Sequence, residues 1–167
     1  MVVLDYVAIF LLLLPLHKKR LSAANYAGLD RYNGEKDAGR GKLMNDKTTS
    51  LCELKTMMAD FVRQRDWEKY HQPKNLAMSI AVETAELMEL FQWHDHEEVK
   101  TFLSNSTNRK LVAHEMADVL AFLLSLSNVT GIDLAASFEE KMAHNAKKYP
   151  AEKMKGHYKR PARAAKA

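Results

Sequence analysis

Apolar residues recur at helical spacing along most of the chain after residue 43, and short polar stretches separate the runs. This pattern predicts main helices over residues 50–70, 73–93, 109–129 and 133–149, and a short helix over residues 97–103. No stretch in this part of the sequence alternates with a period of two, so no strand is expected. Four main helices joined by short connections predict an all-α fold, an antiparallel four-helix bundle.

Capping signals support four of these helix boundaries. Ser50 and Glu53 have the spacing of a capping box, which predicts the start of the first helix. Pro73 suits the first turn of the second helix, and Gly131 suits the position just past the end of the long one. Asp133 can accept hydrogen bonds from the first amides of the last helix. The boundaries therefore rest on local chemistry as well as on periodicity.

The first 43 residues differ from the rest of the chain. Residues 2–16 are mostly apolar and precede a basic cluster, whereas residues 22–42 are polar and hold four of the six glycines. The apolar run is shorter than the ~20 residues of a membrane-spanning helix, and its basic residues follow it, unlike those of a secretory signal. A membrane-surface anchor, a targeting segment and a non-native upstream extension all remain open. We favour the extension, expect no stable membrane insertion, and place one domain at residues 44–150 and a basic tail at 151–167.

Length, cysteine content and charge narrow the class of protein. The 167 residues suit a single domain with its own core, and the single cysteine, Cys52, suits a reducing, cytoplasmic compartment. Net charge is +3 over residues 1–43, −7 over 44–140 and +8 over 141–167. An acidic body with a basic end can hold an anion such as a phosphate chain through bound cations, although a solvated basic tail explains the same distribution.

Two acidic pairs interrupt the apolar stripes of the second and third main helices. Glu83 and Glu86 share a stripe with apolar residues, and so do Glu115 and Asp118, whereas Glu89 rotates off its stripe. Most carboxylates are solvated surface groups. Two pairs on core-facing stripes would repel one another, take up protons or bind cations. Oxygen ligands suit hard cations, Mg²⁺ first, so the pattern predicts a metal site inside a helical bundle.

Other candidate binding residues are weaker in isolation. After residue 43 the only glycines are Gly131 and Gly156, so a glycine-rich phosphate loop is absent. A phosphate ligand would then need metal ions and side chains, and one face of the last helix offers such groups: Lys141, Asn145 and Lys148, followed by Tyr149. Lysines at a helix C-terminus also complement the helix dipole. The two tryptophans, Trp67 and Trp93, lie in sequence on either side of a polar cluster that includes His71, and can either stack on a base or belong to the core.

The acidic signature, with 28 residues between its two pairs, resembles that of the MazG-like all-α nucleoside triphosphate pyrophosphohydrolases, and most closely their dCTP pyrophosphatase branch. The resemblance covers residues 50–155. The stretches that carry it are Arg65-Asp-Trp-Glu68, His71-Gln-Pro-Lys-Asn75, Glu89-Leu-Phe-Gln-Trp93, Glu115-Met-Ala-Asp118 and Lys141-x-x-x-Asn145-x-x-x-Tyr149-Pro150.

The resemblance implies hydrolysis of a nucleoside triphosphate, dCTP or a modified dCTP, to the monophosphate and pyrophosphate. The four acids would bind Mg²⁺. As our own hypothesis, one of them, Glu86, accepts the proton of the attacking water. Three residues of the last helix, Lys141, Asn145 and Tyr149, would hold the phosphate chain, and the two tryptophans would enclose the base. Members form dimers or tetramers with sites near the subunit contacts. Some animal members carry a histidine where this chain has Met58, which leaves the base preference open.

Three other functions remain to be weighed. The same reaction on dUTP or on several triphosphates would need no change in the acidic signature. A helical bundle that binds a nucleotide or a protein partner without turnover is disfavoured because all four acids are present. A nucleic-acid binder that uses the basic tail is disfavoured because the body is acidic and no groove-reading module is present.

Overall fold

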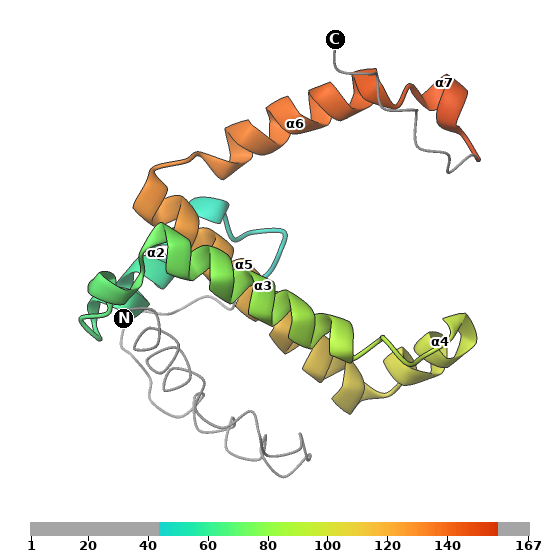
Figure 1. Ribbon diagram of the computed structural model, residues 1–167, viewed down its shortest axis with the longest axis horizontal. Coiled ribbons are helices and arrows are strands. Elements are labelled where there is room, and N and C mark those ends of the chain that lie inside the picture. The colour runs from blue at the N-terminus through green and yellow to red at the C-terminus, as the bar shows by residue number, and fades with distance from the viewer. Residues whose placement is uncertain (1–43, 157–167) are drawn as a thin grey trace, which may run out of the picture. The chain divides into compact units, whose positions relative to one another are not determined.

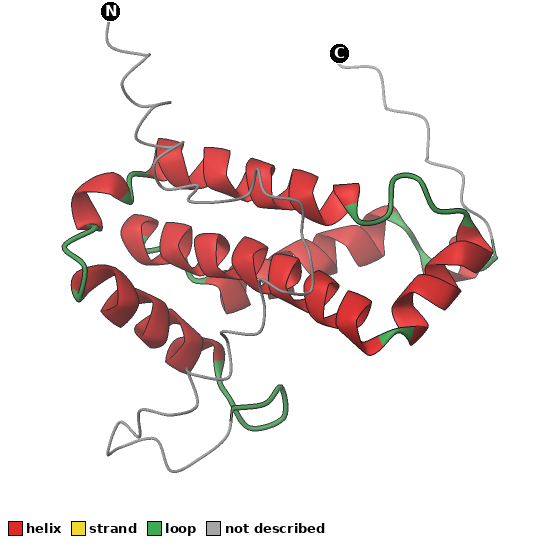
Figure 2. Ribbon diagram, turned by 90° about the horizontal axis from the view of Figure 1, so that it is seen from below, coloured by secondary structure: helices red, strands yellow, loops and turns green. Residues whose placement is uncertain are grey.

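The structure, a computed structural model, describes residues 44–156. The segment predicted to be an extension, residues 1–43, and the end of the predicted tail lie outside the described residues. Every regular element in the described part is a helix, as Figure 2 shows, which confirms the predicted all-α class. The elements are α2 (Leu51–Arg63), η3 (Glu68–Tyr70), α3 (Pro73–Glu89), α4 (His96–Ser104), α5 (Ser106–Thr130), α6 (Leu134–Lys148) and α7 (Ala151–Met154).

Local capping explains where these helices begin. Ser50 and Glu53 form the predicted capping box at α2, and Pro73 occupies the first turn of α3. The Asp133 carboxylate accepts a hydrogen bond from the backbone amide of Ala136 at the start of α6, as predicted. The long helix begins earlier than predicted, because Asn105 caps α5 through the amides of Thr107 and Asn108.

Two predicted helix ends were wrong. The first helix does not continue to residue 70 but ends at Arg63, because Asp66 adopts a left-handed backbone conformation with φ of 51°. The second ends at Glu89, so that Trp93 lies in the turn after it and not in the helix. Trp67 and Trp93, which lie within the predicted helix ranges, therefore sit on connections instead.

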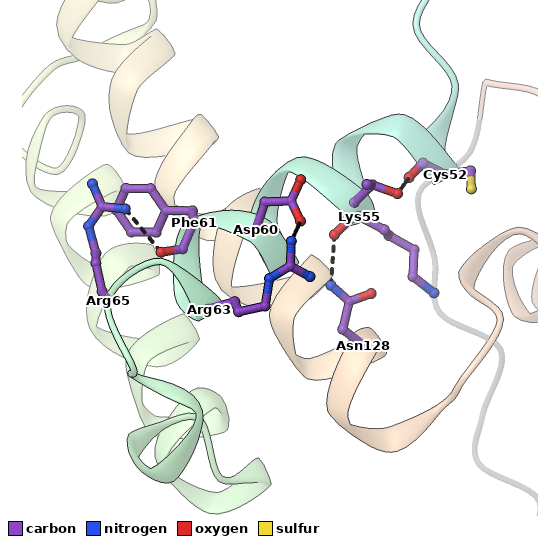
Figure 3. Close-up of polar contacts among 8 residues, drawn as sticks. Cys52, Lys55, Asp60, Phe61, Arg63, Arg65 and Asn128 are labelled. Atoms are coloured by element: carbon purple, nitrogen blue, oxygen red, sulfur yellow. Dashed lines mark hydrogen bonds and ion pairs between the residues drawn. The ribbon is translucent and has the colours of Figure 1, made fainter.

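The core forms where α3 and α5 pack against each other. Their contact is the most extensive in the described part of the chain, and α2 and α4 each add a smaller contact with α5 (Figure 1). The interior side chains include Leu76 from α3, Leu124 from α5 and Val62 from α2. The Asn128 side-chain amide donates a hydrogen bond of 2.9 Å to the backbone carbonyl of Lys55, which ties α5 to α2 (Figure 3).

Helix α6 has no extensive contact with any other described element, and Figure 1 draws it away from α3 and α5. Its side chains Phe138 and Met142, one turn apart, are 69% and 48% exposed. By length and composition, one helix of the described part, α5, could cross a membrane. Because α5 packs against α3 and carries Glu115 and Asp118, we assign it to the core.

Replacing Gly131 with alanine is expected to lower the free energy of unfolding by about 1 kcal/mol, because this C-cap residue adopts φ of 70°. An added Cβ would meet no atom within 4 Å, so the loss is conformational and not steric. Urea unfolding followed by circular dichroism measures it. The matched variant Gly131→Asn should lose less, since asparagine tolerates this conformation better than alanine, and an equal loss in both would contradict the explanation.

Candidate active site

Three carboxylates from α3 and α5 meet where these two helices pack. The ligand oxygens that Glu83, Glu86 and Glu115 offer all lie within 4.8 Å of one another. Glu115 is only 4% exposed, and the two α3 residues are half-buried. The predicted spacing explains the geometry, because residues three apart on a helix share a face. The structure thus brings together three of the four acids that the sequence singled out, from both helices.

The chemistry of this group fits a divalent metal ion. Burying a carboxylate costs free energy unless its charge is compensated, and gathering three within one small volume adds mutual repulsion. A cation among them relieves both. Oxygen donors alone, without histidine or cysteine, are the ligand set that Mg²⁺ and Ca²⁺ take. Glu83, Glu86 and Glu115 would hold such an ion.

The fourth predicted acid, Asp118, lies one turn beyond Glu115 on α5. Its side chain is exposed, and it stands outside the group of three. The two acids nevertheless share a helix face, because they are three residues apart. Asp118 is therefore placed at the edge of the carboxylate group, toward solvent.

The two tryptophans lie on connections at opposite ends of α3. Trp67 precedes this helix by six residues and Trp93 follows it by four. A helix of 17 residues is about 25 Å long. One chain therefore does not place both rings on one base, although each was predicted to enclose it.

Trp67 belongs to an aromatic cluster at the end of α2. Its ring and the Phe61 ring make a T-shaped contact, with centroids 5.9 Å apart, and it lies nearly parallel to the His71 ring, at 6.5 Å and 16°. The His71 Nδ1 atom lies 2.9 Å from the carbonyl oxygen of Trp67. The predicted base-binding residues Trp67 and His71 are thus together and half-buried.

Trp93 lies apart from this cluster and is 85% exposed. It borders a hollow of about 740 Å³ along α4 and the start of α5, with His94 and Phe102 among its lining residues. The rings of His94 and Phe102 are 4.9 Å apart. Trp93 therefore offers a second, separate aromatic surface.

The predicted phosphate-binding residues all belong to α6 or its end. Lys141 and Lys148 are exposed, Asn145 and Tyr149 are half-buried, and the Lys148 ammonium lies 5.1 Å from the centroid of the Tyr149 ring. Because α6 makes no extensive contact with α3 or α5, these groups do not line the carboxylate site of their own chain.

Arg65 and Phe61 are part of the aromatic cluster but were not predicted as site residues. The Arg65 guanidinium carbon lies 3.7 Å from the centroid of the Phe61 ring and 5.8 Å from that of Trp67. The Phe61 position follows the apolar period of the first helix, which is typical of a core residue and gives no sign of a binding site. The sequence signal for Arg65 is its place in Arg65-Asp-Trp-Glu68, one of the stretches that carry the resemblance.

The chain is similar to several known proteins. Residues 78–160 match the MazG-like family. The chain is 32% identical to dCTP pyrophosphatase 1 of Bos taurus over 123 residues, which cover 74% of this chain and 73% of that protein. It is 34% identical to dCTP pyrophosphatase 1 of Homo sapiens over 118 residues, 71% of this chain and 69% of that protein.

A solved structure also matches. A pyrophosphatase from Archaeoglobus fulgidus superposes with a TM-score of 0.57 and 39% sequence identity, covering 65% of this chain and 99% of that one. The family match spans α5, α6 and most of α3, and so includes the three carboxylates and the candidate residues of α6.

Proposed function

The chain belongs to the MazG-like family, and we propose that it hydrolyses dCTP or a modified dCTP, with Mg²⁺, to the monophosphate and pyrophosphate. The observation that carries this proposal is the group of three carboxylates within 4.8 Å, one of them buried, on the two core helices. The curated relatives named dCTP pyrophosphatase 1 support the substrate class. Residues 44–150 form the catalytic domain, and the lone, exposed Cys52 suits a cytoplasmic enzyme.

The carboxylates allow an anionic substrate to bind only through the cations that they hold. A triphosphate is repelled by Glu83, Glu86 and Glu115 unless cations lie between them. When bound, Mg²⁺ offsets the phosphate charge and makes a neighbouring water more acidic. Buried Glu115 fixes one side of the cation site, because its helix is held by the core contact with α3.

Glu86 is our candidate for the general base. It is half-buried on α3, one turn beyond Glu83, and can accept the proton of the attacking water while the other two acids retain the cation. The water oxygen bonds to phosphorus as the bond between the α and β phosphates breaks, and pyrophosphate leaves. Lysines from α6 offset the charge of the leaving group, and no covalent intermediate is required.

We further propose that two copies of the chain complete each site. Large apolar side chains are exposed on α3, α5 and α6, among them Met88, Met116 and Phe138, at 63%, 58% and 69%. Exposed apolar surface on a soluble protein commonly marks a contact with another chain. Within one chain, α6 is apart from the carboxylates, and Trp67 is apart from Trp93. A second copy could supply the missing α6 and the missing tryptophan to each site.

A turnover panel tests the proposed reaction and the preferred nucleobase. We expect the full chain with Mg²⁺ to release monophosphate and pyrophosphate from dCTP or 5-methyl-dCTP at least about tenfold faster than from dTTP or dATP, because one mismatched base hydrogen bond is worth ~1.4 kcal/mol or more. Ion-exchange chromatography separates the products. Fastest turnover of dUTP would favour the dUTP alternative. Binding of dCTP without any turnover would leave a nucleotide-binding bundle as the function.

A further inference from the structure

The turn after α2 has the hydrogen bonds of a Schellman motif. The Trp67 amide donates to the Val62 carbonyl at 3.2 Å, and the Asp66 amide donates to the Arg63 carbonyl at 3.1 Å. Asp66, the left-handed residue of the motif, has φ of 51°. In this motif that position is usually glycine, since a Cβ disfavours the left-handed region. Asp66 is the only residue other than glycine with positive φ among residues 44–156.

This turn determines where the Trp67 ring lies. In a Schellman motif the residue after the left-handed one packs back on the last helical turns, and here Trp67 makes a T-shaped contact with Phe61. If residue 66 had a right-handed backbone conformation, α2 would continue through it. Residue 67 would then lie on the helix itself, and its side chain would point away from its present position, because a helix turns by about 100° per residue. The contact with Phe61 would then be lost, together with the nearly parallel placement of the His71 ring.

A second contact holds the same turn from the outside. The Arg65 side chain lies over the Phe61 ring, and its Nη1 atom donates a hydrogen bond of 3.0 Å to the Phe61 carbonyl (Figure 3). That carbonyl belongs to the last turn of α2, where backbone acceptors lack helical partners. The Asp66 side chain itself is exposed. The contacts therefore act on the backbone of the turn and on the rings around it.

We propose that Asp66 is a positioning residue whose left-handed backbone conformation, and not its carboxylate, sets the Trp67 and His71 rings for the nucleobase. The proposal rests on the proposed function, because it takes these rings as the base-binding surface. Strain kept at a single residue commonly marks a functional site. Its consequence is specific: a defect at Asp66 weakens recognition of the base and leaves recognition of the phosphate chain unchanged.

Four variants separate conformation from charge. Asp66→Asn and Asp66→Gly remove the carboxylate but tolerate positive φ, whereas Asp66→Ala and Asp66→Val remove it and disfavour positive φ. Two ligands separate base from phosphate: dCTP with an imido bridge between its α and β phosphates, which resists hydrolysis, and inorganic tripolyphosphate. Titration calorimetry on the full chain with Mg²⁺ gives the dissociation constant of each.

We expect Asp66→Val to weaken binding of the dCTP analogue about tenfold and Asp66→Ala by less, with tripolyphosphate binding within about twofold of the parent. Asp66→Asn and Asp66→Gly should bind both ligands as the parent does. A matching readout is the near-ultraviolet circular dichroism of Trp67 in a Trp93→Phe background, which should weaken only in the alanine and valine variants.

Three results would overturn the proposal: equal weakening by asparagine and valine, which would assign the role to the carboxylate; equal loss of tripolyphosphate binding, which would indicate general damage; or parental binding by all four variants. A parent chain that binds tripolyphosphate but not the dCTP analogue would instead refute the proposed substrate, and the positioning role with it. The parent measurement thus distinguishes a failure of the function from a failure of Asp66.

Discussion

Replacing Glu115 with glutamine is expected to lower kcat/KM for nucleoside triphosphate hydrolysis by at least about a thousandfold, since a metal ion contributes several kcal/mol to stabilising such a transition state. Glutamine keeps the size of the side chain and one oxygen, but removes the charge that retains the cation. Glu115 is the most buried member of the carboxylate group, so water cannot easily substitute for it. Steady-state kinetics with saturating Mg²⁺ measures the loss.

Glu89→Gln is the matched control for this variant. Glu89 is also an acid of the core helices, at the end of α3, but its side chain is exposed and lies outside the carboxylate group. Its replacement should leave kcat/KM within about twofold of the parent, because its exposed side chain is not one of the three that would hold the cation. Calorimetric titration should show Mg²⁺ binding retained in Glu89→Gln and lost in Glu115→Gln, while circular dichroism shows both folded. Turnover by a folded Glu115→Gln at the parental rate would refute the assigned site.

The acidic site could be predicted from sequence because its signal is local and repeated. The spacing of Glu83 and Glu86 fixes them on one helix face, and Glu115 repeats the pattern on the helix that packs against it. Two charged pairs within apolar stripes leave few alternatives to a compensated interior site. The prediction did not distinguish buried Glu115 from exposed Asp118, because helical periodicity gives the face of a residue but not its depth.

The turn after α2 could not be predicted in the same way. No glycine marks the end of this helix, and Asp66 is an unusual residue for a left-handed cap. The apolar period itself stops at Val62, because residues 63–66 are all polar, but that signal alone does not give the conformation of the turn. The position of α6 poses a different problem. Its apolar face, with Phe138 and Met142, indicates that the helix packs on something, but a sequence pattern does not say whether the partner surface belongs to the same chain.

Complementation between two inactive variants is expected to show which chain supplies α6 to a site. If the carboxylates of one copy work with α6 of another, two inactive variants should restore activity when they assemble together. Glu83→Gln disables the carboxylate group, and Lys141→Ala disables the phosphate-binding face of α6. In a hybrid dimer, one site takes both defects and the other takes neither. A random mixture, half of it hybrid, should therefore recover about a quarter of the parental activity.

Co-expression with two different affinity tags yields the hybrid, which should show about half of the parental activity after purification on both tags. The matched control pairs Glu83→Gln with Glu115→Gln. Both defects then lie in the carboxylate group, so every site of the hybrid carries one, and activity should stay at the level of the single variants. If the hybrid of Glu83→Gln and Lys141→Ala also stays inactive, each site takes its carboxylates and its α6 from one chain. In that case α6 must fold back onto α3 and α5 when substrate binds, because α6 makes no extensive contact with either helix in the structure.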